Sequence, residues 1–315
     1  AVLEPGCGSG NFLGLAPSGL PIDLVGVEAD PVTARIASAL YPDAVIHGSR
    51  FERFELVPDS FDLVIGNVPF ANVTPYDPVH NSAGWSLHNY FIAKSTALVR
   101  PGGLVAVVTS RYTLDAADPT FRRWLGERAD LLGAVRLPSS AFQAVAGTHA
   151  ITDILVLRKH DPSERFAGVH GRQWTETVPM PATFGAGAGG AGASEEPVRI
   201  NEWFLADPAQ TVCGQLGVGR GQYRDGDLVV SAPHDLAATL VRQLAAIPQE
   251  HRSSDTSTRR VRTTATPSSE TDARSSPPDR SEGDSHSAAE IKPLPSSGGL
   301  PHGSIVRSGD GTFAR

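Results

Sequence analysis

The stretch Ala1-Val-Leu-Glu-Pro-Gly-Cys-Gly-Ser-Gly10 decides the fold of this chain. Its first four residues are typical of a short strand, and the next six of a glycine-rich turn. Asn11-Phe-Leu13 is expected to begin a helix. A strand, a glycine loop and a helix N-terminus in succession let a ligand approach the backbone closely. We therefore expect an α/β fold with a ligand at this loop.

A second strand is predicted at Leu24-Val-Gly-Val-Glu28, and it ends in an acid. The distance along the chain from Gly10 to Glu28 is close to the spacing at which such an acid binds ribose hydroxyls. The alternative is a nicotinamide-binding Rossmann domain. However, the third glycine of Gly6-Cys-Gly8-Ser-Gly10 comes one residue too early for the dinucleotide pattern Gly-x-Gly-x-x-Gly.

A helix is predicted to follow, because Asp30-Pro31 is a typical N-cap and first-turn pair. Val32, Ile36 and Leu40 would form its apolar stripe. A third strand is expected at 44–47, with Phe51 on the loop after it.

The stretch Phe61-Asp-Leu-Val-Ile-Gly-Asn-Val-Pro-Phe70 contains a buried strand followed by four residues suited to holding a planar amino group. The Asn67 side-chain oxygen can accept one N–H bond. Pro69 biases Val68 to an extended conformation, so the Val68 carbonyl can accept a second. Phe70 offers a flat face for stacking. The alternative is a plain Asn-x-Pro turn after a strand.

Glu4-Pro-Gly-Cys-Gly-Ser-Gly10, Gly26-Val-Glu-Ala-Asp30 and Asn67-Val-Pro-Phe70 resemble three motifs of one enzyme family. They are similar to the cofactor loop, ribose acid and catalytic motif of S-adenosylmethionine-dependent DNA methyltransferases that act on the 6-amino group of adenine. The resemblance covers about residues 1–160. It implies a Rossmann-like class I methyltransferase fold: a mostly parallel seven-stranded sheet with helices on both faces and a final antiparallel hairpin.

The resemblance also implies roles for individual residues. Glu4 would lie near the methionine end of the cofactor, Glu28 would hold the ribose, and Phe51 would pack on the cofactor adenine. Asn67, Val68, Pro69 and Phe70 would be catalytic. The expected cofactor contacts are Glu4, Pro5, Gly6, Cys7, Gly8, Gly10, Phe12, Glu28, Ala29, Phe51 and Asn67.

The chain departs from the family pattern in two places. The catalytic motif usually has Pro where this chain has Val68, and often Tyr where it has Phe70; a carbonyl and an aromatic face remain in both cases. The acid often found after the third strand is absent from 48–51, which leaves the contact to the cofactor's own amino group without an assigned residue.

Downstream, the loop 71–85 is a candidate lid or target-base contact, with a solvated loop as the alternative. Strands are expected at 104–108, 131–137 and 154–157. His88 is expected to be structural. Five arginines could meet phosphates, but interleaved acids favour a solvated surface for most of them: Arg111, Arg122, Arg123, Arg128 and Arg136.

Four segments are expected. The methyltransferase domain covers 1–160, and it is expected to be truncated at its N-terminus because residue 1 already has the pattern of a strand. A connector with a Gly/Ala linker follows at 161–198, then a small α/β module at 199–248 and a disordered tail at 249–315. The module loosely resembles the segment after the methylase domain in large phage- and plasmid-type methylase–helicase proteins. Helicase or restriction modules outside this chain would then be partners.

Composition and net charge limit the kinds of partner and location that this chain can have. The 315 residues carry 27 Lys+Arg and 34 Asp+Glu, a net charge of −7, so a DNA partner must be argued from the site and not from a basic surface. Two cysteines without metal spacing favour the cytoplasm, and no apolar run reaches membrane-spanning length.

The expected activity is methyl transfer from S-adenosylmethionine to the 6-amino group of a flipped adenine in DNA. Methylation of another planar amino group, a protein glutamine amide or an RNA base, is one alternative. A catalytically silent module that keeps the cofactor fold is the other.

Overall fold

The computed structural model describes residues 1–55, 57–147, 149–162, 172–184, 197–220, 225–248, 306–307 and 313–314. The chain divides into two compact units, Ala1–Thr263 and Thr264–Arg315. In the second unit, β12 (Val306–Arg307) pairs antiparallel with β13 (Phe313–Ala314). The expected disorder of 249–315 and most of the Gly/Ala linker otherwise lie outside the described residues.

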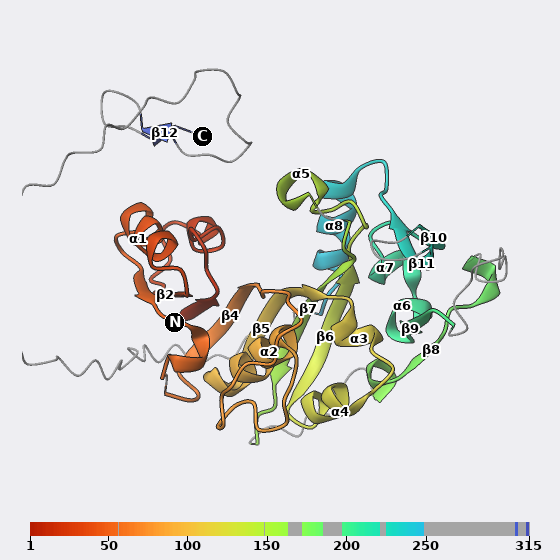
Figure 1. The fold of residues 1–315 in the computed structure, drawn as a ribbon, viewed down its shortest axis with the longest axis horizontal. Helices are drawn as coiled ribbons and strands as arrows, with labels where there is room; N and C mark the ends of the chain where they lie inside the picture. Colours follow the sequence, from red (N-terminus) through yellow and green to blue (C-terminus); the bar gives the residue numbers. More distant parts are fainter. Residues whose placement is uncertain are drawn as a thin grey trace, which may run out of the picture. The chain divides into compact units, whose positions relative to one another are not determined.

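A seven-stranded sheet forms the centre of the first unit, in the order β3-β2-β1-β4-β5-β7-β6 (Figure 1). β7 runs antiparallel to both of its neighbours, and the other pairs are parallel. The predicted mostly parallel sheet with a final antiparallel hairpin is confirmed. The strands are β1 (Val2–Pro5), β2 (Leu24–Glu28), β3 (Val45–Gly48), β4 (Phe61–Asn67), β5 (Val99–Ser110), β6 (Ala129–Arg136) and β7 (Thr152–Lys159).

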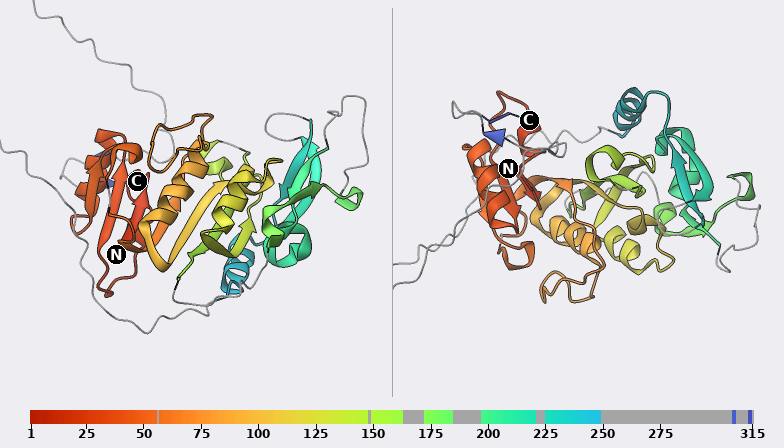
Figure 2. Two further views of the ribbon diagram at one scale, coloured as in Figure 1. Left: turned by 90° about the horizontal axis from the view of Figure 1, so that it is seen from below. Right: turned by 45° about the horizontal axis from the view of Figure 1, so that its top comes forward.

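Helices cover this sheet on two sides. α2 (Leu87–Leu98) packs on β4 and β5, and α4 (Thr120–Gly126) packs on β6. α8 (Leu236–Ala245) also packs on β6, and it lies on the opposite side of the sheet from α2 and α4 (Figure 2). The shorter helices are α3 (Tyr112–Asp115), α5 (Gln143–Ala146), α6 (Trp203–Ala206) and α7 (Pro208–Thr211).

The first predicted helix does not form. After the glycine loop the chain makes only one turn of 3-10 helix, η1 (Leu13–Leu15). Gly14 follows the loop closely, and Pro17 and Gly19 come soon after, which shortens any regular helix here. Tyr41 fills the space beside this turn, because an added Cβ at Gly14 would clash with the Tyr41 hydroxyl.

The helix predicted after the second strand is present as α1 (Pro31–Leu40), with the Asp30 side chain accepting the Thr33 amide at 2.7 Å. Its expected apolar stripe was placed on the wrong face. Val32, Ile36 and Leu40 are 54%, 39% and 46% exposed, while Ala34 and Ala37 are buried. The small alanine side chains let the helix approach β2 and β3 closely, and this packing selects the buried face.

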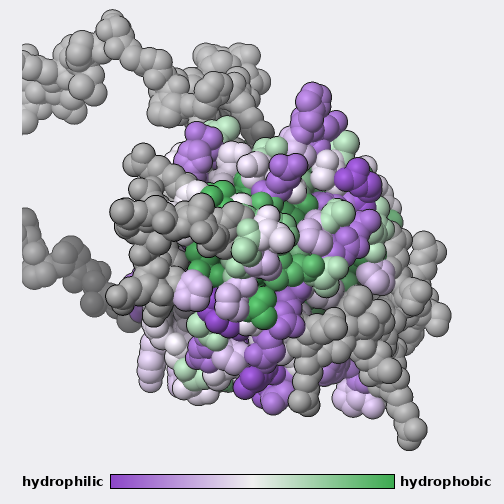
Figure 3. Space-filling model, turned by 90° about the vertical axis from the view of Figure 1, so that its right-hand side faces the viewer, coloured by the Kyte–Doolittle hydropathy of each residue, from purple (hydrophilic) through white to green (hydrophobic). Residues whose placement is uncertain are grey.

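The segment after the predicted connector packs into the same compact unit as the sheet. It contains β9 (Arg199–Asn201), which pairs with β8 (Thr177–Pro179) of the predicted connector, and a hairpin of β10 (Gln215–Arg220) and β11 (Asp225–Ser231). Buried Ile200, Phe204 and Leu228 belong to the main hydrophobic core. Figure 3 shows the side of the protein that lies on the right in Figure 1. Hydrophobic residues gather at the middle of this surface. β10 is rich in glycine, which local sequence patterns do not favour in a strand, and it pairs with β11 along its length.

Candidate active site

The glycine loop turns sharply after β1. The amides of Gly6 and Cys7 both donate to the Val27 carbonyl of β2, at 2.8 and 3.0 Å. Gly6, Gly8 and Gly10 have φ values of +67°, +55° and +88°, a conformation that L side chains rarely adopt. An added Cβ at Gly8 would meet nothing within 4 Å, so the backbone there borders open space.

Glu28 ties the second strand to this loop. One carboxylate oxygen accepts the Gly8 amide at 2.9 Å, and the other accepts the Asp30 amide at 2.8 Å. A carboxylate has about four lone-pair sites, so Glu28 retains capacity for further donors. The acid therefore orients the loop and can still bind a ligand beside it.

Glu4 is buried beneath the same loop, with 3% of its surface exposed. It accepts the Leu13 amide at 3.0 Å. Burial raises the pKa of the Glu4 carboxyl to about 7, although backbone hydrogen bonds from Leu13 and Phe12 work in the opposite direction. Glu4 is thus poised to change protonation near neutral pH.

The tetrapeptide Asn67–Phe70 leaves the sheet at the carboxyl end of β4. The Val68 amide donates to the Val108 carbonyl at 3.0 Å and its side chain is buried, while Asn67 and Phe70 are exposed. Pro69 lies beside the glycine loop, because an added Cβ at Gly6 would come within 3.7 Å of its ring. The fold therefore brings together two motifs that are about 60 residues apart.

The other residues expected to contact the cofactor differ in how far they are exposed. Pro5 and Cys7 are buried, Phe12 is partly buried and Ala29 is exposed. Phe51 is only 3% exposed and packs among Phe91, Tyr90 and Lys94, with the ring centroid 4.8 Å from that of Phe91. A contact between Phe51 and a cofactor ring remains a prediction, since little of its surface is free.

The loop 71–85 is anchored from inside. Asp77 is buried and accepts hydrogen bonds from the Tyr90 hydroxyl at 2.8 Å and the Lys94 ammonium at 3.1 Å. Burial raises the pKa of Asp77, but the His80 amide, the bonds from Tyr90 and Lys94 and the Lys94 charge together hold it below its usual range. Asn81 closes the loop by bonding to Pro75 and Trp85. Tyr76 at the tip is 86% exposed.

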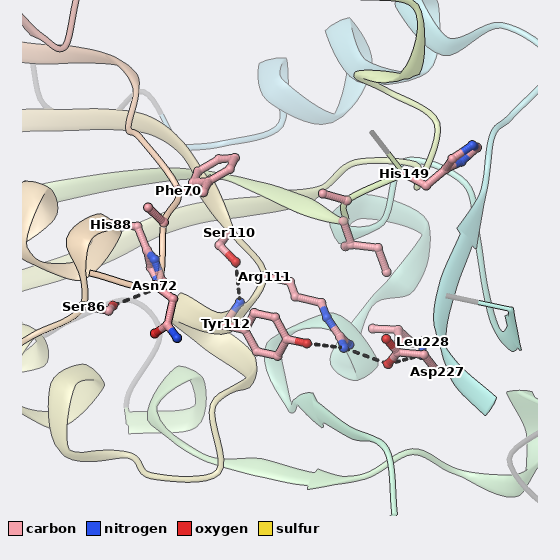
Figure 4. Close-up of a pocket in the computed structure, with 13 residues that line it drawn as sticks. Phe70, Asn72, Ser86, His88, Ser110, Arg111, Tyr112, His149, Asp227 and Leu228 are labelled. Carbon is pink, nitrogen blue, oxygen red and sulfur yellow. Dashed lines mark hydrogen bonds and ion pairs between the residues drawn. The ribbon is translucent and has the colours of Figure 1, made fainter. Parts of the chain in front are cut away.

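A pocket of about 550 Å³ opens beside Phe70 (Figure 4). Its walls come from the ends of β4 and β5, the start of α2, the loop before β7, and β11. Asn72 belongs to the loop 71–85, a predicted candidate for target-base contact. Tyr112 and Asp227 also line the pocket but had no predicted role in the site, because they come from segments far apart in the sequence.

Three of the five arginines expected at the surface are buried, so that expectation was wrong for them. Arg136 is fully buried and makes a bidentate pair with Asp153, at 2.8 and 2.9 Å, and a further ion pair with Asp115 at 2.8 Å. Arg111 pairs with Asp227, and Arg122 donates to the Thr175 carbonyl. Partners distant in sequence make this burial possible: carboxylates for Arg111 and Arg136, and a backbone carbonyl for Arg122.

A seven-stranded sheet in this order, with an antiparallel seventh strand and a glycine loop after the first, defines the class I methyltransferase fold. No protein-family model matches the chain. The Defense against restriction protein B of Escherichia phage P1 is 31% identical over 176 residues, which cover 53% of this chain and 8% of that protein. The chain thus spans a small part of this relative.

Solved structures with a similar fold include two bacterial proteins. A candidate class I S-adenosylmethionine-dependent methyltransferase from Listeria monocytogenes is 20% identical, with 52% of this chain and 55% of that chain covered and a TM-score of 0.45. The modification subunit of a candidate type I restriction enzyme from Vibrio vulnificus is 20% identical, with coverage of 51% and 40% and a TM-score of 0.44. Within the described residues, no helix is long and apolar enough to cross a bilayer.

Proposed function

We propose that this chain binds S-adenosylmethionine at the glycine loop and methylates the 6-amino group of adenine in DNA. The observation that carries the proposal is the approach of Pro69 to Gly6, which sets an exposed Asn67 beside the loop that would hold the cofactor. When bound, the cofactor would supply an electrophilic methyl group. The positive-φ glycines and the open space at Gly8 fit a ligand lying against the backbone.

The residues of the chain would then orient the acceptor nitrogen. The lone pair of an adenine amino group is delocalised into the ring. Hydrogen bonds from both amino hydrogens, one to the Asn67 side-chain oxygen and one to the Val68 carbonyl, would localise this lone pair on the nitrogen. These two acceptors also stabilise the positive charge that develops there. Phe70, 41% exposed, would stack on the base once it has left the duplex.

The proposal of DNA as substrate has support from the phage relative. Its name describes defence against restriction, and chemical modification of DNA bases is one route to such a defence. Helicase or restriction modules outside this chain remain proposed partners, on the strength of the resemblance in sequence.

Transfer of a labelled methyl group to unmethylated DNA, RNA and protein, tested in parallel, would test this function. We expect label in DNA, recovered as N6-methyladenine after hydrolysis, and none with Asn67→Ala. Label in RNA or on a glutamine side chain alone would overturn the choice of substrate. Cofactor binding without transfer to any of the three would leave a silent binding module.

A further inference from the structure

The pocket beside Phe70 carries a second exposed aromatic ring. Tyr112, the first residue of α3, lines the pocket and is 46% exposed, close to the 41% of Phe70 (Figure 4). Large aromatic side chains usually bury most of their surface. Two such rings presented to one pocket therefore need an explanation beyond folding.

Tyr112 is held in place by Arg111. The Arg111 guanidinium donates to the Tyr112 hydroxyl at 3.1 Å and lies over the ring, 4.7 Å from its centroid. One face and the polar end of Tyr112 are thus engaged. A ring fixed in this way loses less conformational freedom when a ligand stacks on its free surface.

Arg111 is in turn held by an ion pair with β11, in the C-terminal part of the same unit. It donates to Asp227 of β11 at 2.8 Å, and its guanidinium lies 3.9 Å from the Asp115 carboxylate. Arg111 and Asp227 are both nearly buried, and Asp227 also accepts the amide of Leu228. Arg111 and Asp227, 116 positions apart in the sequence, therefore together fix the orientation of the Tyr112 ring.

The chemistry of the pocket favours an uncharged planar ligand. Among the described residues that line it, Arg111 is paired with Asp227, and this ion pair carries no net charge to attract a phosphate. Burial lowers the pKa of the His88 imidazole to about 4, which keeps this wall residue neutral at physiological pH. Asn72, Ser86 and Ser110 add neutral hydrogen-bonding groups of the kind that contact base edges.

We propose that Tyr112 is a second base-stacking residue, which binds a nucleotide next to the target, and that Arg111 and Asp227 are its positioning residues. The proposal rests on the proposed function. A volume of about 550 Å³ is in the range of pockets that take drug-sized ligands, and such a pocket has room for more than one base. The C-terminal segment would then take part in substrate binding through Asp227.

Binding of a single-stranded, fluorescein-labelled octadenylate in the presence of S-adenosylhomocysteine tests this directly. Stacking on an aromatic side chain contributes about 1–3 kcal/mol per base, so Tyr112→Ala should weaken binding roughly 5- to 150-fold. Tyr112→Trp should retain binding. The control is Val241→Ala, which shortens a 67% exposed side chain on α8 that does not line the pocket and should have no effect.

A second probe separates stacking from a loss of structure. An octamer with abasic sites throughout keeps the phosphates, so Tyr112→Ala should leave its weaker binding unchanged. In the octadenylate assay, Asp227→Asn should weaken binding in the wild-type background and add nothing to Tyr112→Ala. Equal losses with both probes, or no loss with either, would overturn the proposal.

The octadenylate-binding assay and the methylation assay can be interpreted separately. Wild-type methylation of DNA together with unchanged octadenylate binding by Tyr112→Ala would remove Tyr112 and leave the proposed function standing. Absence of methyl transfer to DNA by the wild type would instead remove the proposed function itself.

Discussion

The Glu28 carboxylate accepts a hydrogen bond from the Gly8 amide at 2.9 Å and so couples the end of β2 to the glycine loop. Any ligand bound by Glu28 is therefore bound beside a loop that the same side chain orients. This coupling makes the residue important both for direct contact and for the shape of the site.

Glu28→Ala should weaken S-adenosylmethionine binding roughly ten- to a hundredfold, because charge-assisted hydrogen bonds contribute about 1.5–3 kcal/mol. Glu28→Gln keeps an acceptor for Gly8 and should lose less. Calorimetric titration of folded variants measures both. Unchanged affinity in Glu28→Ala would remove this carboxylate from the cofactor site.

Cofactor affinity should depend on pH through Glu4. The resemblance places this acid near the methionine end of the cofactor, where its ionised form would favour a positive ammonium group. Its pKa is raised to about 7, so the ionised fraction falls as pH drops. Through this group, affinity should be about tenfold lower at pH 6 than at pH 8.

Calorimetry between pH 6 and 8, in two buffers of different ionisation enthalpy, measures this effect and the proton released on binding. Glu4→Gln serves as the control because it cannot ionise, and its affinity should be independent of pH in this range. A flat profile in the wild type would show that Glu4 does not change protonation on binding.

Asn67→Ala should reduce methyl transfer by roughly 10² to 10³, the usual cost of losing one preorganised partner of a developing charge. Its affinity for the cofactor should stay near that of the wild type, because Asn67 acts mainly on the base. Single-turnover methylation and a binding titration separate the two quantities. Turnover within a few-fold of the wild type would show that 67–70 is only a turn.

Phe70→Ala should weaken capture of the extruded base by about 1–3 kcal/mol, since one stacking partner is lost. Phe70→Tyr keeps an aromatic face and should be tolerated. Single-turnover rates measured over a range of DNA concentrations report this loss. If the single-turnover rate of Phe70→Ala saturates at the same DNA concentration as that of the wild type, another residue must stack on the base.

Arg136→Ala should destabilise the fold by roughly 3–5 kcal/mol, because it leaves the buried Asp153 and Asp115 carboxylates without their partner. Urea denaturation gives the free energy of unfolding. The control is Arg128→Ala, which removes an exposed pair with Glu127 and should cost less than about 1 kcal/mol. Equal losses in the two variants would contradict the importance of the buried pairs.

The sequence by itself determined the features that depend on near neighbours. The strand ending at Glu28, the helix start at Asp30 and the turn through Gly6 to Gly10 each follow from local patterns of hydrophobicity, capping and glycine conformation. The position of Asn67 at the end of β4 was predictable for the same reason.

Only the tertiary structure decided which surfaces and charges are buried. Val32, Ile36 and Leu40 form a regular stripe, yet the smaller face with Ala34 and Ala37 packs against the sheet.

Arg111 carries no sequence sign of burial, because its partner Asp227 is 116 residues away. The free energy of burying a charge or choosing a helix face depends on groups that meet only in the folded chain, and local sequence patterns do not contain this information.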